Sequence, residues 1–179
     1  PDVVTEAPPG TAEIPHTPYT LEGAEKLGGA LVGFKGGRVV VMVSSIPFKC
    51  PAAPYETALL MEAFFRERGR RGKVEMEIIT PEPQPMPVAG PVLGEAVKGI
   101  LSARGIGYRP NTPVSSVDVA GKSLVLKDGG SVPFDLLIAV PPHKPPAVVR
   151  DSGLAGETGW VPVDRFTLET RQEGVYAIG

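Results

Sequence analysis

The sequence has little of the material from which metal sites, disulfide frameworks and membrane spans are built. It contains one cysteine and two histidines in 179 residues, which excludes an internal disulfide and argues against a classical structural metal site. No apolar run approaches the ~20 residues needed to cross a bilayer, and residues 1–10 lack the features of a signal peptide. We therefore expect no metal and a cytoplasmic location, with any membrane contact peripheral and made through regions outside this chain.

Charge is scarce as well as balanced. The 18 basic and 20 acidic residues give a formal charge of −2, and the two signs are interspersed along the chain. A nucleic-acid-binding protein carries a basic patch or stripe, so this class is excluded. A hydrophobic content of 42% is enough to bury a core.

Proline and glycine are abundant, with 21 and 22 residues, but most of them stand between periodic segments and so mark the loops of an ordered domain. Residues 1–20 are the exception, because they contain five prolines and little periodicity. We expect residues 1–30 to form an irregular connecting arm.

Residues 37–104 predict a βαβα unit. The unbroken apolar run Val39–Val43 is typical of a central strand that is buried on both faces of a parallel sheet. An apolar stripe from Tyr55 to Phe65 predicts a helix that ends at Gly69. Residues 73–80 alternate as a strand does, and a second helix is expected to begin at Pro91 and run through Arg104.

The segments that follow predict strands. We expect one strand near Tyr108, short antiparallel strands that turn at Gly121 and at residues 128–129, and a buried strand over residues 136–140. "GVYAIG" at residues 174–179 also has the pattern of an apolar strand. The fold class is therefore α/β: a Rossmann-like three-layer domain with a βαβα unit, an antiparallel β-meander and a parallel central sheet.

This order of elements, ending in "VYAIG", resembles the second nucleotide-binding domain of the pyridine nucleotide-disulfide oxidoreductase superfamily of FAD-dependent flavoproteins. The segment "PFKCPAAPYE" is similar to one found in the sulfide:quinone oxidoreductase and flavocytochrome c sulfide dehydrogenase group, and "FDLLIAVPPH" and "GWVPVD" also resemble that group. The resemblance covers most of the chain from about Pro18. It implies a second Rossmann domain at residues 31–145 and a return connection toward the FAD domain at 146–179.

The resemblance also implies roles for the cysteine and for cofactor contacts. Cys50 matches a redox-active cysteine near the flavin that pairs with a second cysteine from the C-terminal region of the family. In the family an FAD-binding aspartate follows "VYAIG", and this chain ends at Gly179, so Gly179 is a candidate cofactor contact, as is Lys49 beside Cys50. We therefore expect a truncated fragment that is inactive alone, with FAD in the intact protein.

Other residues near Cys50 have both functional and structural interpretations. Lys49 and the start of the following helix would favour a thiolate, although a buried structural thiol is the ordinary alternative for a single cysteine. Glu56 is a candidate proton acceptor or simply a helix-start carboxylate. Pro142 and His143 follow the last buried strand, so they are candidates for the flavin side or ordinary loop residues.

The turn at residues 44–54 argues against NAD(P) binding. Pyrophosphate needs close approach to bare backbone at a helix start, whereas this turn has three prolines and no glycine. We expect an FAD-dependent oxidoreductase that oxidises sulfide or a small sulfur compound and passes electrons to a quinone or cytochrome. An NAD(P)H-dependent flavin dehydrogenase and a non-enzymatic interaction domain with a structural cysteine remain alternatives.

Overall fold

The structure is a computed structural model that describes residues 2–3, 8–14 and 16–178. Its contacts divide the chain into two compact units. The larger unit lies within residues 5–142, and the smaller combines residues 1–4 with residues 143–179.

The larger unit is built on a four-stranded parallel sheet in the order β4-β3-β2-β8. Its strands are β2 (Gly37–Val43), β3 (Val74–Ile79), β4 (Ile106–Arg109) and β8 (Leu136–Val140). Val41 of β2 lies opposite Ile78 of β3 on one side and Ile138 of β8 on the other. The predicted central position of this apolar run is therefore confirmed.

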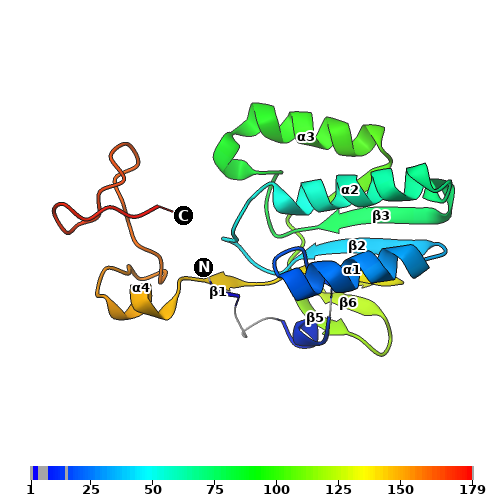
Figure 1. Ribbon diagram of the computed structural model, residues 1–179, viewed down its shortest axis with the longest axis horizontal. Helices are drawn as coiled ribbons and strands as arrows, with labels where there is room; N and C mark the ends of the chain where they lie inside the picture. Colours follow the sequence, from blue (N-terminus) through cyan, green and yellow to red (C-terminus); the bar gives the residue numbers. More distant parts are fainter. Residues whose placement is uncertain (1, 4–7, 15, 179) are drawn as a thin grey trace. The chain divides into compact units, whose positions relative to one another are not determined.

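Each face of the sheet is covered by a different layer. Because successive side chains of a strand point to opposite faces, Val39 and Val41 pack into the helical layer, while Val40 and Met42 pack against the meander. The helices are α1 (Leu21–Gly33), α2 (Ala53–Glu67) and α3 (Pro91–Ala103); the meander strands are β5 (Val114–Asp118), β6 (Ser123–Leu126) and β7 (Ser131–Pro133). Figure 1 shows α2 and α3 on the side of the sheet opposite to β5 and β6, and the predicted three-layer α/β fold is confirmed.

Local sequence signals explain the two predicted helices. Pro54 stands in the first turn of α2, and Gly69, with φ +64°, follows its end. Pro91 is the first residue of α3, and Gly105, with φ +63°, follows it. Proline fits the first turn of a helix because its missing N–H would be unbonded there, and glycine accepts the left-handed backbone that stops a helix. Short 3-10 helices lie at Thr11–Glu13, Arg71–Lys73 and Pro87–Ala89.

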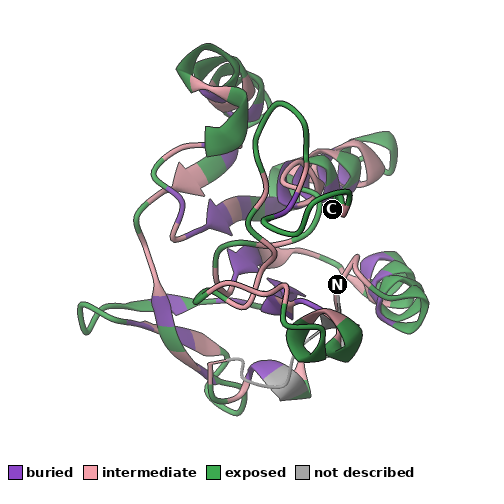
Figure 2. Ribbon diagram, turned by 90° about the vertical axis from the view of Figure 1, so that its left-hand side faces the viewer, coloured by how far each residue is buried: buried purple, intermediate pink, exposed green. Residues whose placement is uncertain are grey.

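The prediction of an irregular arm through residue 30 is wrong for its last ten residues, which form most of α1. Thr20 caps this helix by accepting a hydrogen bond from the Gly23 N–H at 3.0 Å. Four glycines make the intrinsic helix propensity poor, but Leu27 and Leu31 are buried in the same core as α2. Tertiary packing therefore outweighs propensity in this segment. Figure 2 shows this inward burial, with buried residues on the sheet side of the helices and exposed residues on their outer sides.

The smaller unit contains little regular structure. It includes β1 (Asp2–Val3), which pairs antiparallel with β9 (His143–Lys144), and the short helix α4 (Ala147–Asp151). A mostly apolar hollow of about 280 Å³ is lined by Pro145, Pro146, Val149, Trp160, Val161, Val163, Ala177 and Ile178. The assignment of residues 146–179 to a return connection stays a prediction.

The strand predicted for "GVYAIG" does not form in the described part of this segment. Within residues 174–178, Tyr176 makes an isolated antiparallel bridge with Glu169, and both Tyr176 and Ile178 are exposed. A buried strand needs neighbours that cover its edges and faces, and among the residues described this segment pairs with neither β1 nor β9.

No helix in the described part of the chain is both long enough and apolar enough to span a bilayer.

Candidate active site

Cys50 lies on the turn between β2 and α2, at the carboxyl edge of the parallel sheet. Its φ of +57° is in the left-handed region, which costs a residue with a Cβ about 1 kcal/mol. Its carbonyl oxygen accepts hydrogen bonds from the Ala53 N–H at 3.0 Å and from the Tyr19 hydroxyl at 3.4 Å, and these bonds hold the turn. Cys50 itself is exposed, so this turn presents the thiol on the surface rather than in the core.

Lys49 is the neighbouring charged group of this turn. It is exposed, and its Nζ lies 6.0 Å from the centre of the Tyr19 ring. Cys50 precedes Ala53, the first residue of α2, by three positions. The thiol therefore lies near the start of this helix but not in its first turn. The structure thus brings a lysine, a thiol and a tyrosine together at one edge of the sheet.

Glu56 lies in the first turn of α2 with an exposed side chain. Its N–H donates to the Ala52 carbonyl at 3.0 Å, and with Leu59 and Leu60 it lines a shallow surface hollow. An exposed carboxylate near the first turn of a helix can exchange protons with solvent and complement the helix dipole. Both interpretations of Glu56 are compatible with this position.

A buried carboxyl group, Glu82, lies just beyond the end of β3. It is only 3% exposed, and its Oε2 accepts hydrogen bonds from the Tyr55 hydroxyl at 2.6 Å and from Thr80 Oγ1 at 3.2 Å. Its own N–H donates to Thr80 Oγ1 at 3.1 Å, and its carbonyl accepts from the Asn111 N–H at 2.9 Å. Glu82 therefore joins the first turn of α2 to the loop after β3.

Burial shifts the titration of the groups in this cluster. Desolvation raises the pKa of Glu82, and the hydrogen bonds from Tyr55 and Thr80 oppose that shift. Burial raises the pKa of Tyr108 to about 12, and its ring centre lies 6.1 Å from that of Tyr55. The pKa of Tyr19 is raised by burial and then by the negative charges of Cys50, Glu82 and Glu56. Negative charge on either Cys50 or Glu82 therefore affects the pKa of Tyr19.

Pro142 lies in a separate part of the same sheet edge. It is buried and lines a crevice of about 410 Å³ at the carboxyl ends of β2, β3 and β8. The other lining residues are Pro8, Ser44, Ser45, Ile46, Pro81, Pro113, Val114, Ser115 and Lys127. Ligands of open α/β sheets bind at such edges, so the position of Pro142 is compatible with its predicted cofactor contact.

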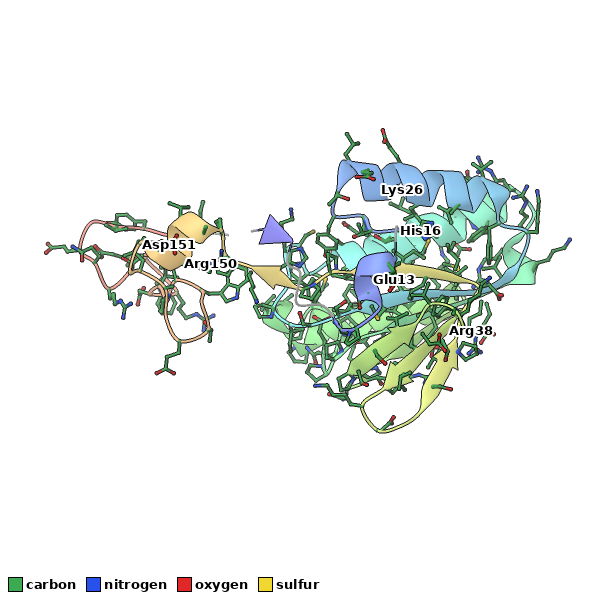
Figure 3. All side chains as sticks on the ribbon, turned by 90° about the horizontal axis from the view of Figure 1, so that it is seen from below. Glu13, His16, Lys26, Arg38, Arg150 and Asp151 are labelled. Atoms are coloured by element: carbon green, nitrogen blue, oxygen red, sulfur yellow. The ribbon has the colours of Figure 1, made fainter. Side chains whose placement is uncertain are left out.

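Two predicted site residues lie outside the larger unit. His143 is buried and belongs to the smaller unit, and Gly179 lies outside the described residues. His16, labelled in Figure 3, has its Nδ1 3.3 Å from the Leu137 carbonyl of β8. This contact gives His16 a role in packing the arm against the sheet.

Glu82 was not predicted as a site residue because it stands in a proline-rich segment with the composition of a loop. Its position three residues after the end of β3 could have indicated a site residue, because ligands of α/β sheets bind at the carboxyl ends of the parallel strands. In the described part of the chain, no three His, Cys, Asp or Glu side chains are grouped in a way that could hold a metal ion.

Comparisons with known proteins agree with this architecture. Residues 56–179 match the model of the family described as pyridine nucleotide-disulphide oxidoreductase. The chain is 30% identical over 173 residues to the mitochondrial sulfide:quinone oxidoreductase of Mus musculus, covering 90% of this chain and 37% of that protein. It is 27% identical over 169 residues to the protein of the same name from Dictyostelium discoideum, covering 90% of this chain and 36% of that one.

A solved structure shows the same fold. The sulfide:quinone oxidoreductase of the hyperthermophilic bacterium Aquifex aeolicus superimposes with a TM-score of 0.72 at 26% identity, over 92% of this chain and 40% of that one. The chain thus spans well under half the length of the relatives that it matches.

Proposed function

Because the chain belongs to the pyridine nucleotide-disulphide oxidoreductase family, we propose that it is part of an FAD-dependent oxidoreductase whose redox-active disulfide includes Cys50. The complete protein would oxidise sulfide or a small sulfur compound and pass the electrons to a quinone or a cytochrome. The observation that carries this proposal is the exposed thiol at the carboxyl edge of the sheet, in a chain similar to sulfide:quinone oxidoreductases.

The chemistry requires a thiol that substrate can reach. Hydrosulfide attacks one sulfur of the disulfide, a new S–S bond forms to that cysteine, and the other cysteine leaves as a thiolate. Substrate sulfur is thereby oxidised by two electrons and the cysteine pair is reduced. The proton of the hydrosulfide must also leave, and Glu56 is an exposed carboxylate in the first turn of the helix that follows Cys50. The partner cysteine comes from outside this chain, because Cys50 is its only cysteine.

The turn that carries Cys50 fits a flavin in the chemistry of its side chains. A bound flavin would supply two-electron acceptor chemistry, and a cation of this turn would stabilise negative charge that develops beside the thiol. Lys49 places an exposed ammonium group next to the exposed thiol. Pro142, His143 and Gly179 remain proposed contacts of the cofactor.

Two features support the absence of NAD(P) from the larger unit. The turn after β2 offers no glycine, and three prolines reduce its amide donors. In dinucleotide-binding units an acidic side chain farther along binds a ribose hydroxyl, whereas Glu82 already accepts the Tyr55 hydroxyl at 2.6 Å. Calorimetric titration of the complete protein with NADH is expected to give no binding heat, and micromolar binding would revive the NAD(P)H dehydrogenase alternative.

A quinone acceptor would bring the complete protein to a membrane surface, and we propose peripheral contact through regions other than this chain. The location predicted from the sequence is cytoplasmic, while the named relatives are mitochondrial. Cell fractionation of the complete protein, with a salt wash of the membrane pellet, tests both parts.

The decisive experiment is anaerobic sulfide reduction of the complete protein carrying its flavin. Sulfide should bleach the oxidised flavin band in the wild type, and Cys50→Ala should slow this step by about 1000-fold or more, as loss of a nucleophile does. Ser131→Ala, an equally small truncation at an exposed position of β7, serves as the control. A Cys50→Ala protein that bleaches at the wild-type rate would refute the proposal and favour a structural cysteine.

A further inference from the structure

The outer surface of helix α3 is apolar, whereas that of α2 is mostly charged. The exposed residues of α3, a helix that is described throughout, are Pro91, Val92, Leu93, Glu95, Ala96, Gly99, Ile100, Ser102 and Ala103. Those of α2 are Glu56, Leu60, Arg66 and Glu67. Val92 is 86% exposed, and Val88, just before the helix, is 85% exposed. An apolar surface of this extent on a helix marks an interaction site.

The apolar residues of this surface form one continuous face. Counted at about 100° per residue, they fall within roughly one third of the helix circumference. We call this surface the α3 face, and its residues are Val92, Leu93, Ala96, Gly99, Ile100 and Ala103. Gly94 and Leu101 are buried on the opposite side of the helix. Ala96 stands at the centre of the α3 face, and Figure 1 shows α3 at the outer edge of the larger unit.

The shape of the α3 face is complementary to a second copy of itself. If two copies pack antiparallel with a two-fold axis between their Ala96 residues, Val92 of one copy lies opposite Ile100 of the other. Leu93 then lies opposite Gly99, where a Cβ would meet no atom within 4 Å, so a large side chain meets open space. The small Ala96 side chains at the axis let the two helices approach closely.

The charges beside the α3 face are complementary in the same arrangement. Glu95 and Lys98 lie on one flank of the face, where Lys98 Nζ is 2.7 Å from Glu95 Oε1. In an antiparallel pair related by a two-fold axis, the same flank of each helix meets its counterpart, so each Glu95 lies beside the Lys98 of the other copy. The two intrahelical pairs then join into a cluster of four alternating charges. A second copy of this chain therefore fits the α3 face in both shape and charge.

We propose that the α3 face is a dimer contact of the complete protein, in which two copies of α3 pack antiparallel about a two-fold axis at Ala96. Such an interface is isologous, so each contact occurs twice. One helix pair is a small interface, and small interfaces give weak dimers. The proposal concerns assembly, goes beyond the proposed function and requires no reaction at Cys50.

Sedimentation equilibrium of the complete protein with its flavin, from about 1 to 100 µM, tests the association. We expect a monomer–dimer equilibrium in this range. Ala96→Lys places two like charges at the two-fold axis and should weaken the dimer by about 100-fold or more. Ser131→Lys adds the same charge at an exposed position of β7 and should leave the dimer unchanged.

An exchange of charges tests which residues meet. Glu95→Lys and Lys98→Glu each put like charges on the two facing flanks, so each variant alone should form a dimer about 10-fold weaker than that of the wild type. In an equimolar mixture of the two variants, lysines on one copy face glutamates on the other. The mixture should therefore form a mixed dimer as stable as that of the wild type.

Disulfide cross-linking tests the register with two conservative variants of the same helix. In the antiparallel pair the Ala96 residues face each other, so Ala96→Cys should give a covalent dimer on mild oxidation that a reductant separates. The Ala103 residues would lie roughly 20 Å apart, since each is seven residues from the axis and a helix rises 1.5 Å per residue. Ala103→Cys should therefore remain uncross-linked, as should the wild type.

Three results would overturn the proposal. A complete protein that is monomeric over the whole range would mean that another part of the protein, and not a second copy, covers the α3 face. A dimer that Ala96→Lys leaves intact would mean association through a different surface. Equal cross-linking of Ala96→Cys and Ala103→Cys, or no recovery in the mixture of charge variants, would refute the antiparallel contact.

Discussion

Tyr55 and Tyr108 are neighbouring tyrosines, and substituting each with phenylalanine separates the effect of the hydroxyl bond to Glu82 from the effect of ring packing. Tyr55→Phe removes the hydroxyl that donates to Glu82 at 2.6 Å and leaves the ring in place. The lost bond joins a hydroxyl to a buried carboxyl group, and such bonds contribute about 1.5–3 kcal/mol. For a chain of this size, each kcal/mol lowers the melting temperature by roughly 2–4 °C. We expect Tyr55→Phe to lower it by about 5 °C.

Tyr108→Phe is the matched control for this prediction. The Tyr108 hydroxyl is also buried and affects the pKa of the neighbouring Tyr55 hydroxyl, but it meets no hydrogen-bond geometry within the described residues. Removing an unbonded buried hydroxyl should change the free energy of unfolding by less than about 0.5 kcal/mol or stabilise the fold. Urea unfolding followed by far-ultraviolet circular dichroism measures both variants. Equal losses in the two variants would show that ring packing, and not the bond to Glu82, accounts for the stability.

Two further perturbations test how the larger unit is held together. Glu62→Gln weakens the ion pairs that the buried Glu62 carboxylate makes with partly exposed arginines, including Arg104 at 3.0 Å, and should cost about 1.5 kcal/mol in urea unfolding. Glu75→Gln removes an exposed pair and should cost under about 0.5 kcal/mol, so similar costs would contradict the burial argument. Gly10→Ala would place a Cβ 2.1 Å from the Val117 carbonyl oxygen at a φ of +84°. We expect faster hydrogen exchange at the Val117 amide, which donates to Pro9, and unchanged exchange would contradict it.

Most of the sheet and two of its helices could be predicted from the sequence because their signals are local. The apolar run of β2 and the helical stripe of α2 each carry their own periodicity, and proline and glycine mark the ends of the helices. Helix α1 could not be predicted, since its glycines contradict the helix and its stability comes from Leu27 and Leu31 packing on distant segments. At residues 174–178 the apolar pattern predicts a strand, but the segment forms only an isolated bridge. The local pattern is not sufficient, because a strand also needs neighbouring strands to pair with.

The candidate site was predictable only in part for the same reason. Cys50 could be found from its flanking residues, and its surface position agrees with a reactive role. The link from Tyr55 to Glu82 joins residues 27 positions apart and depends on which helix face meets which strand end. A single sequence does not reveal which face of α2 packs on the end of β3. From the sequence, Glu82 is therefore predicted only as part of a proline-rich loop.

The pairing of β2 with β8 has a consequence for how the protein is made. Val39 of β2 pairs with Leu136 of β8. The ribosome adds β8 about 100 residues after β2, so β2 lacks this neighbour until then. At about 5–20 residues per second, a ribosome needs roughly 5–20 s to add that segment. During this interval β2 would present an unpaired apolar edge, which is the kind of surface that invites association with other chains. Until β8 is made, association of this strand edge with other chains competes with completion of the sheet.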